Sequence, residues 1–253
     1  MILRRLGNKK KIAKEIQKHF PPHKIYIEPF FGAGGMFFNK PKAHCNIMND
    51  LDSDVFNLFN VVSTKIEKLK ELFLITPKHQ DLLNYWKENK EKDDIRKAMR
   101  FLFLSNYTFQ GAGASLKVNS RNDVKQLEKG LLDIKEKIFE VQFCNMDCNK
   151  FIKLISIEQH EIKKTFIYCD PPYLGTGNNY SNSFTEEQST ELFDTLEETG
   201  CKFAMSEFDH PFILEQAKQR NLNVIIIGER QNLKNRRTEI LVTNYSNSQQ
   251  SLF

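Results

Sequence analysis

The sequence lacks several features that would assign it to a secreted or membrane-bound class. Its five cysteines form no paired framework, which excludes a disulfide scaffold and indicates reduced thiols. No apolar stretch reaches membrane-spanning length, and the mean hydropathy of -0.51 excludes a membrane protein. No apolar signal core follows Met1–Arg5, and no repeat or low-complexity linker is evident. We therefore expect a cytoplasmic globular protein.

Metal-ligand patterns are also scarce. Cys144 and Cys148 are close in sequence, but no second ligand pair accompanies them and no histidine cluster is visible, so we expect no metal site. What the chain does have is length and apolar content. With 253 residues, 40% of them hydrophobic, it can hold one large α/β domain with an insert.

The net charge of +5 is modest, but the basic residues are clustered near the start, in the middle and near the end of the chain. The three clusters are Arg4, Arg5, Lys9, Lys10, Lys11 and Lys14; Lys117, Arg121 and Lys125; and Arg230, Lys234, Arg236 and Arg237. Such clusters can neutralise phosphates, which points to a nucleic-acid partner. The alternative, for any single lysine, is a solvated surface.

The most informative motif is Asp170-Pro171-Pro172-Tyr173, which closes the apolar run Thr165–Cys169, a predicted buried strand. A carboxylate can accept a hydrogen bond from an exocyclic amine. The two prolines stiffen the turn and can leave a carbonyl, that of Pro171, pointing outward as a second acceptor. The tyrosine can stack on the ring that carries the amine. The alternative is an ordinary turn at the end of a strand.

A second motif lies near the N-terminus. A predicted strand, Lys24–Ile27, is followed by Glu28-Pro29-Phe30-Phe31-Gly32-Ala33-Gly34-Gly35, and the glycines allow a tight turn and close approach of a ligand to the backbone. The next strand, His44–Met48, ends in Asn49-Asp50. An acid at that place can accept hydrogen bonds from ribose hydroxyls, as in dinucleotide-binding folds.

Together these motifs resemble those of the Dam-like, alpha-group DNA adenine N6-methyltransferases. Phe30–Gly34 resembles their S-adenosylmethionine-binding motif, and Asp170–Tyr173 resembles their catalytic motif. Asn182–Thr185 resembles the segment after the catalytic motif, and Lys9 falls where the family has a lysine near the cofactor. The chain departs from the family's usual pattern at two positions, Arg5 and Asn8.

The resemblance implies S-adenosylmethionine as cofactor and double-stranded DNA as substrate. It implies that the target adenine is flipped out of the duplex, that Tyr173 stacks on it, and that Asp170 and the Pro171 carbonyl accept hydrogen bonds from N6. Alternative activities are methylation of cytosine N4, RNA or a glutamine side chain, or an inactive DNA-binding relative. A cognate restriction endonuclease is a candidate partner, and we expect a monomer or weak dimer.

The expected fold is α/β, with a Rossmann-like methyltransferase sheet formed by residues 1–52 and 140–253 and ending in an antiparallel hairpin. Strands are predicted near Ile25, Ile47, Val141, Phe166, Phe203, Val224 and Ile240. Helices are predicted over Thr185–Glu198 and Pro211–Gln219. The Thr185 position offers a capping residue, with two acids in the first turn.

Residues 53–139 break the strand–helix alternation and form the expected target-recognition insert. Helices are predicted over Val55–Leu74, Gln80–Lys90, Asp94–Leu104 and Val124–Ile138. Asn106–Asn119 is predicted to be a glycine-tipped β-hairpin that reads base edges. The residues expected to contact DNA are Tyr107, Gln110, Lys117, Asn119 and Arg121, with Arg236 and Arg237 supplying charge. The alternative for this segment is a surface loop without base contact.

Two further carboxylates have two interpretations each. Asp147 falls where the resembling enzymes place an acid near the cofactor's adenine ring, but it can equally be the N-cap of a helix near Lys150. Glu28 can face the methionine amino group of the cofactor, or it can form an ion pair with Lys9. The expected cofactor-binding residues are thus Lys9, Glu28, Phe30, Phe31, Gly32, Gly34, Asp50, Asp147 and Asp170.

Overall fold

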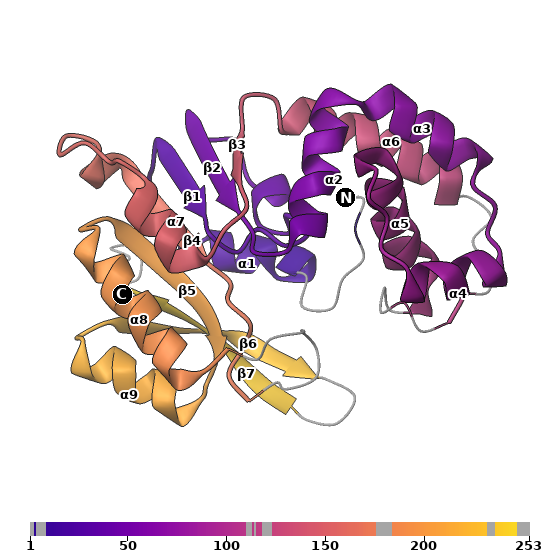
Figure 1. Cartoon of the computed structure of the whole chain (residues 1–253). Coiled ribbons are helices and arrows are strands. Elements are labelled where there is room, and N and C mark those ends of the chain that lie inside the picture. The colour runs from indigo at the N-terminus through magenta and orange to yellow at the C-terminus, as the bar shows by residue number, and fades with distance from the viewer. Residues whose placement is uncertain are drawn as a thin grey trace.

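The computed structural model describes residues 3, 9–109, 113, 115–117, 123–175, 184–231 and 236–246. Figure 1 shows a twisted sheet with helices beside it and a helical lobe at the other end of the molecule. No helix in this described part of the chain is long and apolar enough to cross a membrane.

The sheet has seven strands in the order β3-β2-β1-β4-β5-β7-β6. Their bounds are β1 Ile25–Glu28, β2 Cys45–Asn49, β3 Gln142–Cys144, β4 Thr165–Cys169, β5 Lys202–Phe208, β6 Asn223–Gln231 and β7 Arg236–Thr243. The pairs from β3 to β5 are parallel, whereas β7 is antiparallel to both of its neighbours. The predicted α/β class, the seven strands and the C-terminal antiparallel hairpin are confirmed.

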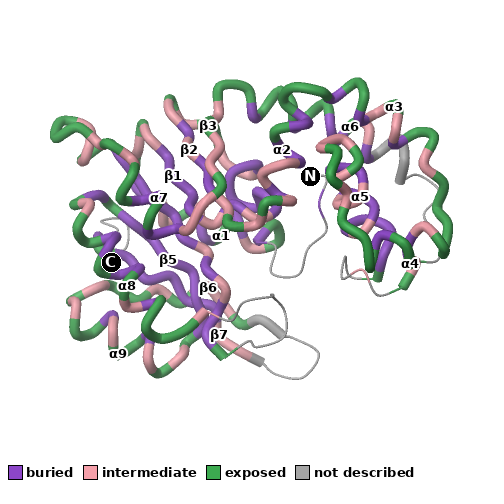
Figure 2. The backbone as a smooth tube through the Cα atoms, in the orientation of Figure 1, coloured by how far each residue is buried: buried purple, intermediate pink, exposed green. Residues whose placement is uncertain are grey.

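Three helices cover one face of the sheet. They are α7 Cys148–Leu154, α8 Glu186–Glu198 and α9 Pro211–Gln219. They pack on the buried side chains of one set of alternating strand residues, including Ile27, Ile167 and Met205. Figure 2 shows these strands buried behind helices whose outer sides are exposed. The predicted cap of α8 is present, since Thr185 and Gln188 form a reciprocal capping box.

The opposite face carries aromatic side chains, among them Tyr26, Phe166 and Tyr168, which are fully buried. The short helix α1 Ala13–Gln17 and the loop after β1 pack on this face. Short 3-10 helices lie at η1 Lys9–Lys11, η2 Phe37–Asn39 and η4 Ile162–Lys164.

The lobe between β2 and β3 is helical, as predicted. Its helices are α2 Ser53–Thr64, α3 Ile66–Ile75, α4 Gln80–Glu88, α5 Asp94–Tyr107 and α6 Asp123–Lys137. The single helix expected over Val55–Leu74 is wrong, because Lys65 leaves the helical conformation at φ −137°. The Thr64 hydroxyl donates to the carbonyl of Asn60 at 2.7 Å, a local bond of the kind that competes with helix continuation.

Aromatic side chains join this lobe to the sheet. Phe31 of the loop after β1 lies edge-on to Phe59 of α2, with ring centroids 4.9 Å apart, and Phe59 stacks on Phe143 of β3 at 5.6 Å. These rings belong to one continuous buried cluster that extends from the sheet into α2–α6. The insert is therefore packed against the sheet rather than tethered to it.

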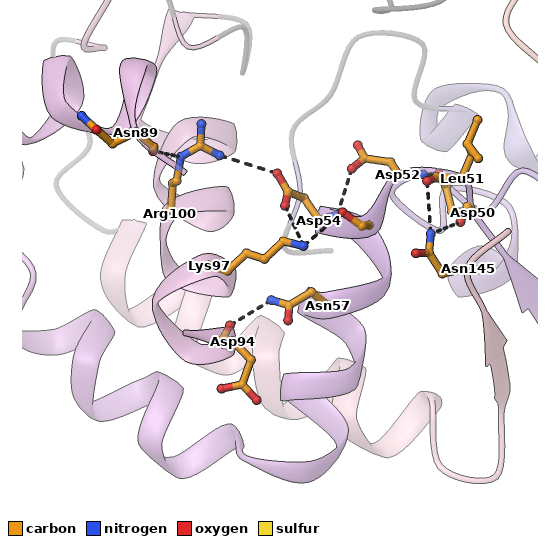
Figure 3. Close-up of polar contacts among 11 residues, drawn as sticks. Asp50, Leu51, Asp52, Asp54, Asn57, Asn89, Asp94, Lys97, Arg100 and Asn145 are labelled. Carbon is orange, nitrogen blue, oxygen red and sulfur yellow. Dashed lines mark hydrogen bonds and ion pairs between the residues drawn. The ribbon is translucent and has the colours of Figure 1, made fainter. Parts of the chain in front are cut away.

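Polar contacts fix the start of the lobe. Asn145 after β3 donates to the carbonyls of Asp50 and Leu51 after β2 at 2.7 and 3.1 Å, as Figure 3 shows. Asp52 caps α2, and Asp54 in its first turn pairs with Lys97 and Arg100 of α5 at 3.4 and 3.5 Å. The chain from the end of β2 into α2 is thus fixed to the helix that leads to the expected recognition segment.

That segment follows the prediction in part. Helix α5 continues through Tyr107, three residues beyond the expected end. The two sides of the loop pair in antiparallel fashion, as in a hairpin: Thr108 and Leu116 form a bridge, the Phe109 N–H donates to the Ser115 carbonyl at 2.9 Å, and the Lys117 N–H donates to the Tyr107 carbonyl at 2.8 Å. Gln110, Asn119 and Arg121 lie outside the described residues.

Candidate active site

The strand order places the expected ligand crevice between β1 and β4. Chain connections run from β1 toward β2 and from β4 toward β5, so they leave β1 and β4 in opposite directions. In open α/β sheets, ligands bind at the carboxyl ends of the strands where the order reverses in this way. The glycine loop follows β1 and the Asp170 motif follows β4, so the two motifs meet at this crevice.

The glycine loop is fixed by the end of β2. The N–H of Gly32 donates to Asp50 Oδ2 at 2.6 Å, and Asp50 Oδ1 accepts from the N–H of Asp52 at 2.8 Å. Gly32 has a φ of +54°, and a Cβ built there would meet no atom within 4 Å. The space beside Gly32 is the kind of opening that lets a ligand approach a backbone closely.

Gly34 has a different role. Its φ is +69°, and a Cβ there would lie 2.3 Å from the Phe38 ring and 2.8 Å from the Phe31 ring. It therefore allows the aromatic rings to pack under the loop. Phe31 itself is a core residue, 3% exposed, whereas the partly buried Phe30 lies edge-on to Phe184 at 6.1 Å.

Asp170 lies in a compact polar cluster with Lys9. The Lys9 ammonium is 2.7 Å from Asp170 Oδ1 and 3.4 Å from Glu239 Oε1, and it sits 4.3 Å from the centre of the Tyr173 ring. Lys9 is 3% exposed, so its charge is balanced almost entirely by these neighbours. The sequence associated Lys9 with the cofactor, and the structure places it directly against the Asp170 motif.

Tyr173 is held at both ends. Its hydroxyl donates to Glu239 Oε1 at 2.5 Å, and its ring lies edge-on to Phe208, with centroids 4.6 Å apart. Burial, followed by the negative charges of Asp170 and Glu239, raises the pKa of the Tyr173 phenol well above its usual value. The phenol therefore stays protonated and acts as a donor.

Glu28 faces inward at the end of β1. The hydroxyl of Tyr26 donates to Glu28 Oε2 at 2.9 Å, while the ion pairs of Lys9 go to Asp170 and Glu239. Burial raises the pKa of Glu28 well above the ordinary glutamate value, and the charge of Asp170 raises it further.

Asp147 occupies the N-cap position of α7. Its Oδ1 accepts from the backbone N–H groups of Asn149 and Lys150, each at 3.1 Å. The capping interpretation thus describes the contacts of this carboxylate. Burial raises the pKa of the neighbouring Cys148 thiol to about 12, which makes it unreactive. No metal-binding cluster occurs within the described ranges.

The structure changes the interpretation of two residues expected to bind DNA. Tyr107 is 4% exposed and packs between Phe73 and Phe103, with centroids at 6.1 and 5.3 Å, so its ring is part of the insert's core. The Arg237 guanidinium lies 5.5 Å from the Phe208 ring centre and 3.5 Å from the Leu174 carbonyl. Arg237 therefore borders the Asp170 motif.

Two other predicted DNA-binding residues, Lys117 and Arg236, lie in the described part of the chain. Lys117 is exposed, and its backbone N–H bonds to the Tyr107 carbonyl at 2.8 Å. Arg236 begins β7, and its side chain lies outside the described part.

Two site residues were not anticipated from the sequence. Glu207 in β5 and Glu239 in β7 are each 1% exposed; Glu239 accepts from Tyr173 of the Asp170 motif, and Glu207 accepts from Leu174, the next residue. The available signal was a carboxylate inside each of two otherwise apolar strands, since such residues are almost never fully buried without a partner.

An open cavity of about 590 Å³ lies far from this cluster, near the amino ends of β1, β2 and β5. Its basic lining residues are Lys18, His23, Lys40, Lys42 and Lys202. None of the predicted site residues borders it.

Comparison with known proteins identifies the chemistry of the crevice. The family of D12 class N6 adenine-specific DNA methyltransferases matches residues 6–240. The chain belongs to this family. It is an S-adenosylmethionine-dependent methyltransferase that acts on adenine in DNA, which confirms the predicted cofactor and reaction.

Individual relatives support the same family assignment. The DNA adenine methylase of Escherichia coli K12 is 27% identical over 241 residues, which cover 87% of this chain and 84% of that protein. A DNA adenine methylase of Vibrio cholerae is 26% identical over 242 residues, covering 87% and 85%. The Type II methyltransferase M1.LlaDCHI of Lactococcus lactis subsp. cremoris is 24% identical over 274 positions, covering 95% and 94%.

Proposed function

We propose that Asp170, Pro171 and Tyr173 hold the N6 amino group of an adenine that has been flipped out of double-stranded DNA. The observation that supports this proposal is the meeting of the glycine loop and the Asp170 motif at the β1–β4 crevice. A base inside a duplex cannot reach such a crevice, so it must leave the stack.

The residues around the glycine loop fit S-adenosylmethionine, because open space lies beside Gly32 and the Asp50 carboxylate lies next to it. The bound cofactor supplies an electrophilic methyl group on a sulfonium. Asp50 would accept hydrogen bonds from the ribose hydroxyls, and Phe30, in the loop after β1, would pack on the cofactor. Glu28, at the end of β1, would face the cofactor's methionine amino group.

Asp170 orients the amine and directs the nitrogen lone pair toward the methyl carbon. The Pro171 carbonyl is the second acceptor, and Pro172 fixes the turn. S-Adenosylmethionine, when bound, would supply the methyl group to N6, and Asp170 or solvent would take the proton that N6 loses. Positioning and electrostatics account for the catalysis, without a covalent enzyme intermediate.

Residues 53–139 form the proposed recognition insert and residues 1–52 and 140–253 the catalytic domain. Lys117, together with Gln110, Asn119 and Arg121, contacts the DNA, while Arg236 and Arg237 neutralise phosphates beside the catalytic motif. The chain acts in the cytoplasm, as a monomer or weak dimer. A cognate restriction endonuclease is the proposed partner, in line with the name of the Lactococcus lactis relative.

The test is methyl transfer from labelled S-adenosylmethionine to unmethylated DNA, followed by nucleoside analysis. Wild-type protein should produce N6-methyladenine, and Asp170→Ala should abolish the product while retaining DNA binding. Asp194→Asn is the matched carboxylate control, because Asp194 lies on α8, is half exposed and pairs with Arg220 at 2.6 Å. Production of N4-methylcytosine instead, or full activity of Asp170→Ala, would overturn the assignment.

A further inference from the structure

Two buried carboxyl groups that the proposed mechanism does not use flank the Asp170 motif. Cys169 at the end of β4 pairs with Met205, so the motif continues beside the last residues of β5, which include Glu207. In turn, Phe208 of β5 pairs with Glu239 of β7. The neighbouring strands therefore bring both carboxyls to the same end of the sheet as the motif.

One carboxyl contacts the last residue of the motif, and the other contacts the residue after it. Glu207 Oε1 accepts from the backbone N–H of Leu174 at 2.8 Å, directly after Tyr173. Glu239 Oε1 accepts from the Tyr173 hydroxyl at 2.5 Å and lies 3.4 Å from the Lys9 ammonium. One contact fixes the backbone after the tyrosine, and the other fixes the far end of its ring.

Burying these two carboxyl groups is unfavourable for folding. Glu207 Oε2 is buried and has no hydrogen-bond partner among the described residues. A buried polar group without a partner is unfavourable, and an apolar side chain of similar volume would avoid that cost. Folding alone gives no reason for an acid at this position, whereas a role in holding the motif does.

We propose that Glu207 and Glu239 are positioning residues for methyl transfer, which fix the place and orientation of the Tyr173 ring and the turn that carries Asp170. This inference rests on the proposed role of Asp170–Tyr173. Displacing a reacting group by about 1 Å can lower a rate on the order of 100-fold, so two anchors on one short turn are enough to control turnover.

The protonation state of Glu207 supports the same view. Burial raises the pKa of Glu207 to about 9, so the group is neutral at pH 7 to 8. The charged groups that act on it are Lys9 before α1, which lowers the pKa, and Asp170 after β4 and Glu239 in β7, which raise it. Ionisation above that pH would add a negative charge beside Asp170 and Glu239, so turnover should fall there.

The experiment compares Glu207→Gln with Glu207→Leu, using purified full-length protein. Glutamine keeps the oxygen that accepts from Leu174 but cannot ionise, and leucine removes the acceptor. We expect Glu207→Leu to lower kcat about 100-fold, with DNA KM and S-adenosylmethionine affinity nearly unchanged. Glu207→Gln should restore most of that rate and lose the alkaline limb of the kcat–pH profile near pH 9.

Stability gives an independent readout if the leucine variant folds poorly. An acid whose pKa is raised in the folded state opposes folding at every pH above its unfolded pKa. Glu207→Gln should therefore be at least as stable as wild type at pH 8, and this advantage should vanish near pH 4. A glutamine variant that keeps the wild-type alkaline limb would contradict the inference.

Glu239 is tested in the same way, since Glu239→Gln still accepts from Tyr173 and Glu239→Leu does not. Met205→Leu, a volume-conserving change in β5, is the control for packing. Unchanged kcat in both leucine variants would overturn the positioning role while leaving the proposed function intact. Wild-type protein without adenine methylation would instead overturn the proposed function.

Discussion

Lys9 Nζ lies 2.7 Å from Asp170 Oδ1 and over the Tyr173 ring, where the target amine and its ring are proposed to bind. A carboxylate has two oxygens, so Asp170 can accept from Lys9 and from a target amine at the same time. Glu239 Oε1 lies 3.4 Å from the same ammonium. The buried Lys9 cation is therefore paired with two carboxylates.

Removing that cation should destabilise the fold. Lys9→Met leaves the partly exposed Asp170 and the buried Glu239 without the Lys9 charge between them. Breaking a buried pair in this way costs roughly 3–5 kcal/mol of unfolding free energy. Urea unfolding of the variant and of wild type measures this loss.

Lys10→Met is the control for that prediction, because Lys10 is adjacent in sequence and its side chain is exposed. Its unfolding free energy should stay within about 0.5 kcal/mol of wild type. Equal stability of the Lys9 and Lys10 variants would show that the buried charge cluster does not support the fold.

Cofactor binding should depend on the charge of Asp50. In Asp50→Ala the ribose hydroxyls lose a charged acceptor and the Gly32 N–H loses its partner, worth roughly 1.5–3 kcal/mol, or about 10- to 100-fold in affinity. Asp50→Asn retains one neutral acceptor and should lose less. Calorimetric titration with S-adenosylmethionine ranks the three proteins, and equal affinity in folded Asp50→Ala would remove Asp50 from the binding site.

The two left-handed glycines of the loop should respond differently to alanine. Both substitutions place a side chain at positive φ, which costs roughly 1–2 kcal/mol. Only at Gly34 does the new methyl group meet the Phe38 and Phe31 rings, which adds an overpacking cost of about 1–3 kcal/mol.

At Gly32 the methyl group enters open space, so Gly32→Ala should mainly weaken S-adenosylmethionine binding. Thermal unfolding and calorimetry, run on both variants, separate the two effects. Weaker cofactor binding in Gly34→Ala at unchanged stability would reverse the assignment of the two glycines.

The sequence was sufficient to predict the motifs, the strands and the family, because these depend on local patterns. The strand before Asp170 is a short apolar run, and it is buried at every position. The same local patterns do not predict packing between distant segments. Nothing local to Tyr107 distinguishes an aromatic ring that reads DNA from one that fills the space beside Phe73.

The same limit explains Glu207 and Glu239. Their roles follow from pairing between β5 and β7, a contact between distant segments that hydrophobic periodicity does not report. The position of Lys9 could be predicted only in part. Family resemblance associated it with the cofactor, but its contact with Asp170 depends on how the N-terminal segment returns to the end of β4.

Tyr107 and Lys117 provide a final test of how the recognition segment is built, since they lie side by side across the loop but differ in burial. Tyr107→Ala removes a buried ring and should cost about 3–5 kcal/mol of stability. Lys117→Ala should leave the free energy of unfolding within about 0.5 kcal/mol of wild type.

Lys117 is also proposed to contact DNA. If that contact is to a phosphate, removing Lys117 should weaken DNA binding across sequences and reduce the slope of log K against log salt by about 1. Fluorescence anisotropy at several salt concentrations measures that slope. A Lys117→Ala variant with the wild-type slope would move the phosphate contact to another part of the insert, and a stable Tyr107→Ala variant with altered site preference would return that ring to the DNA interface.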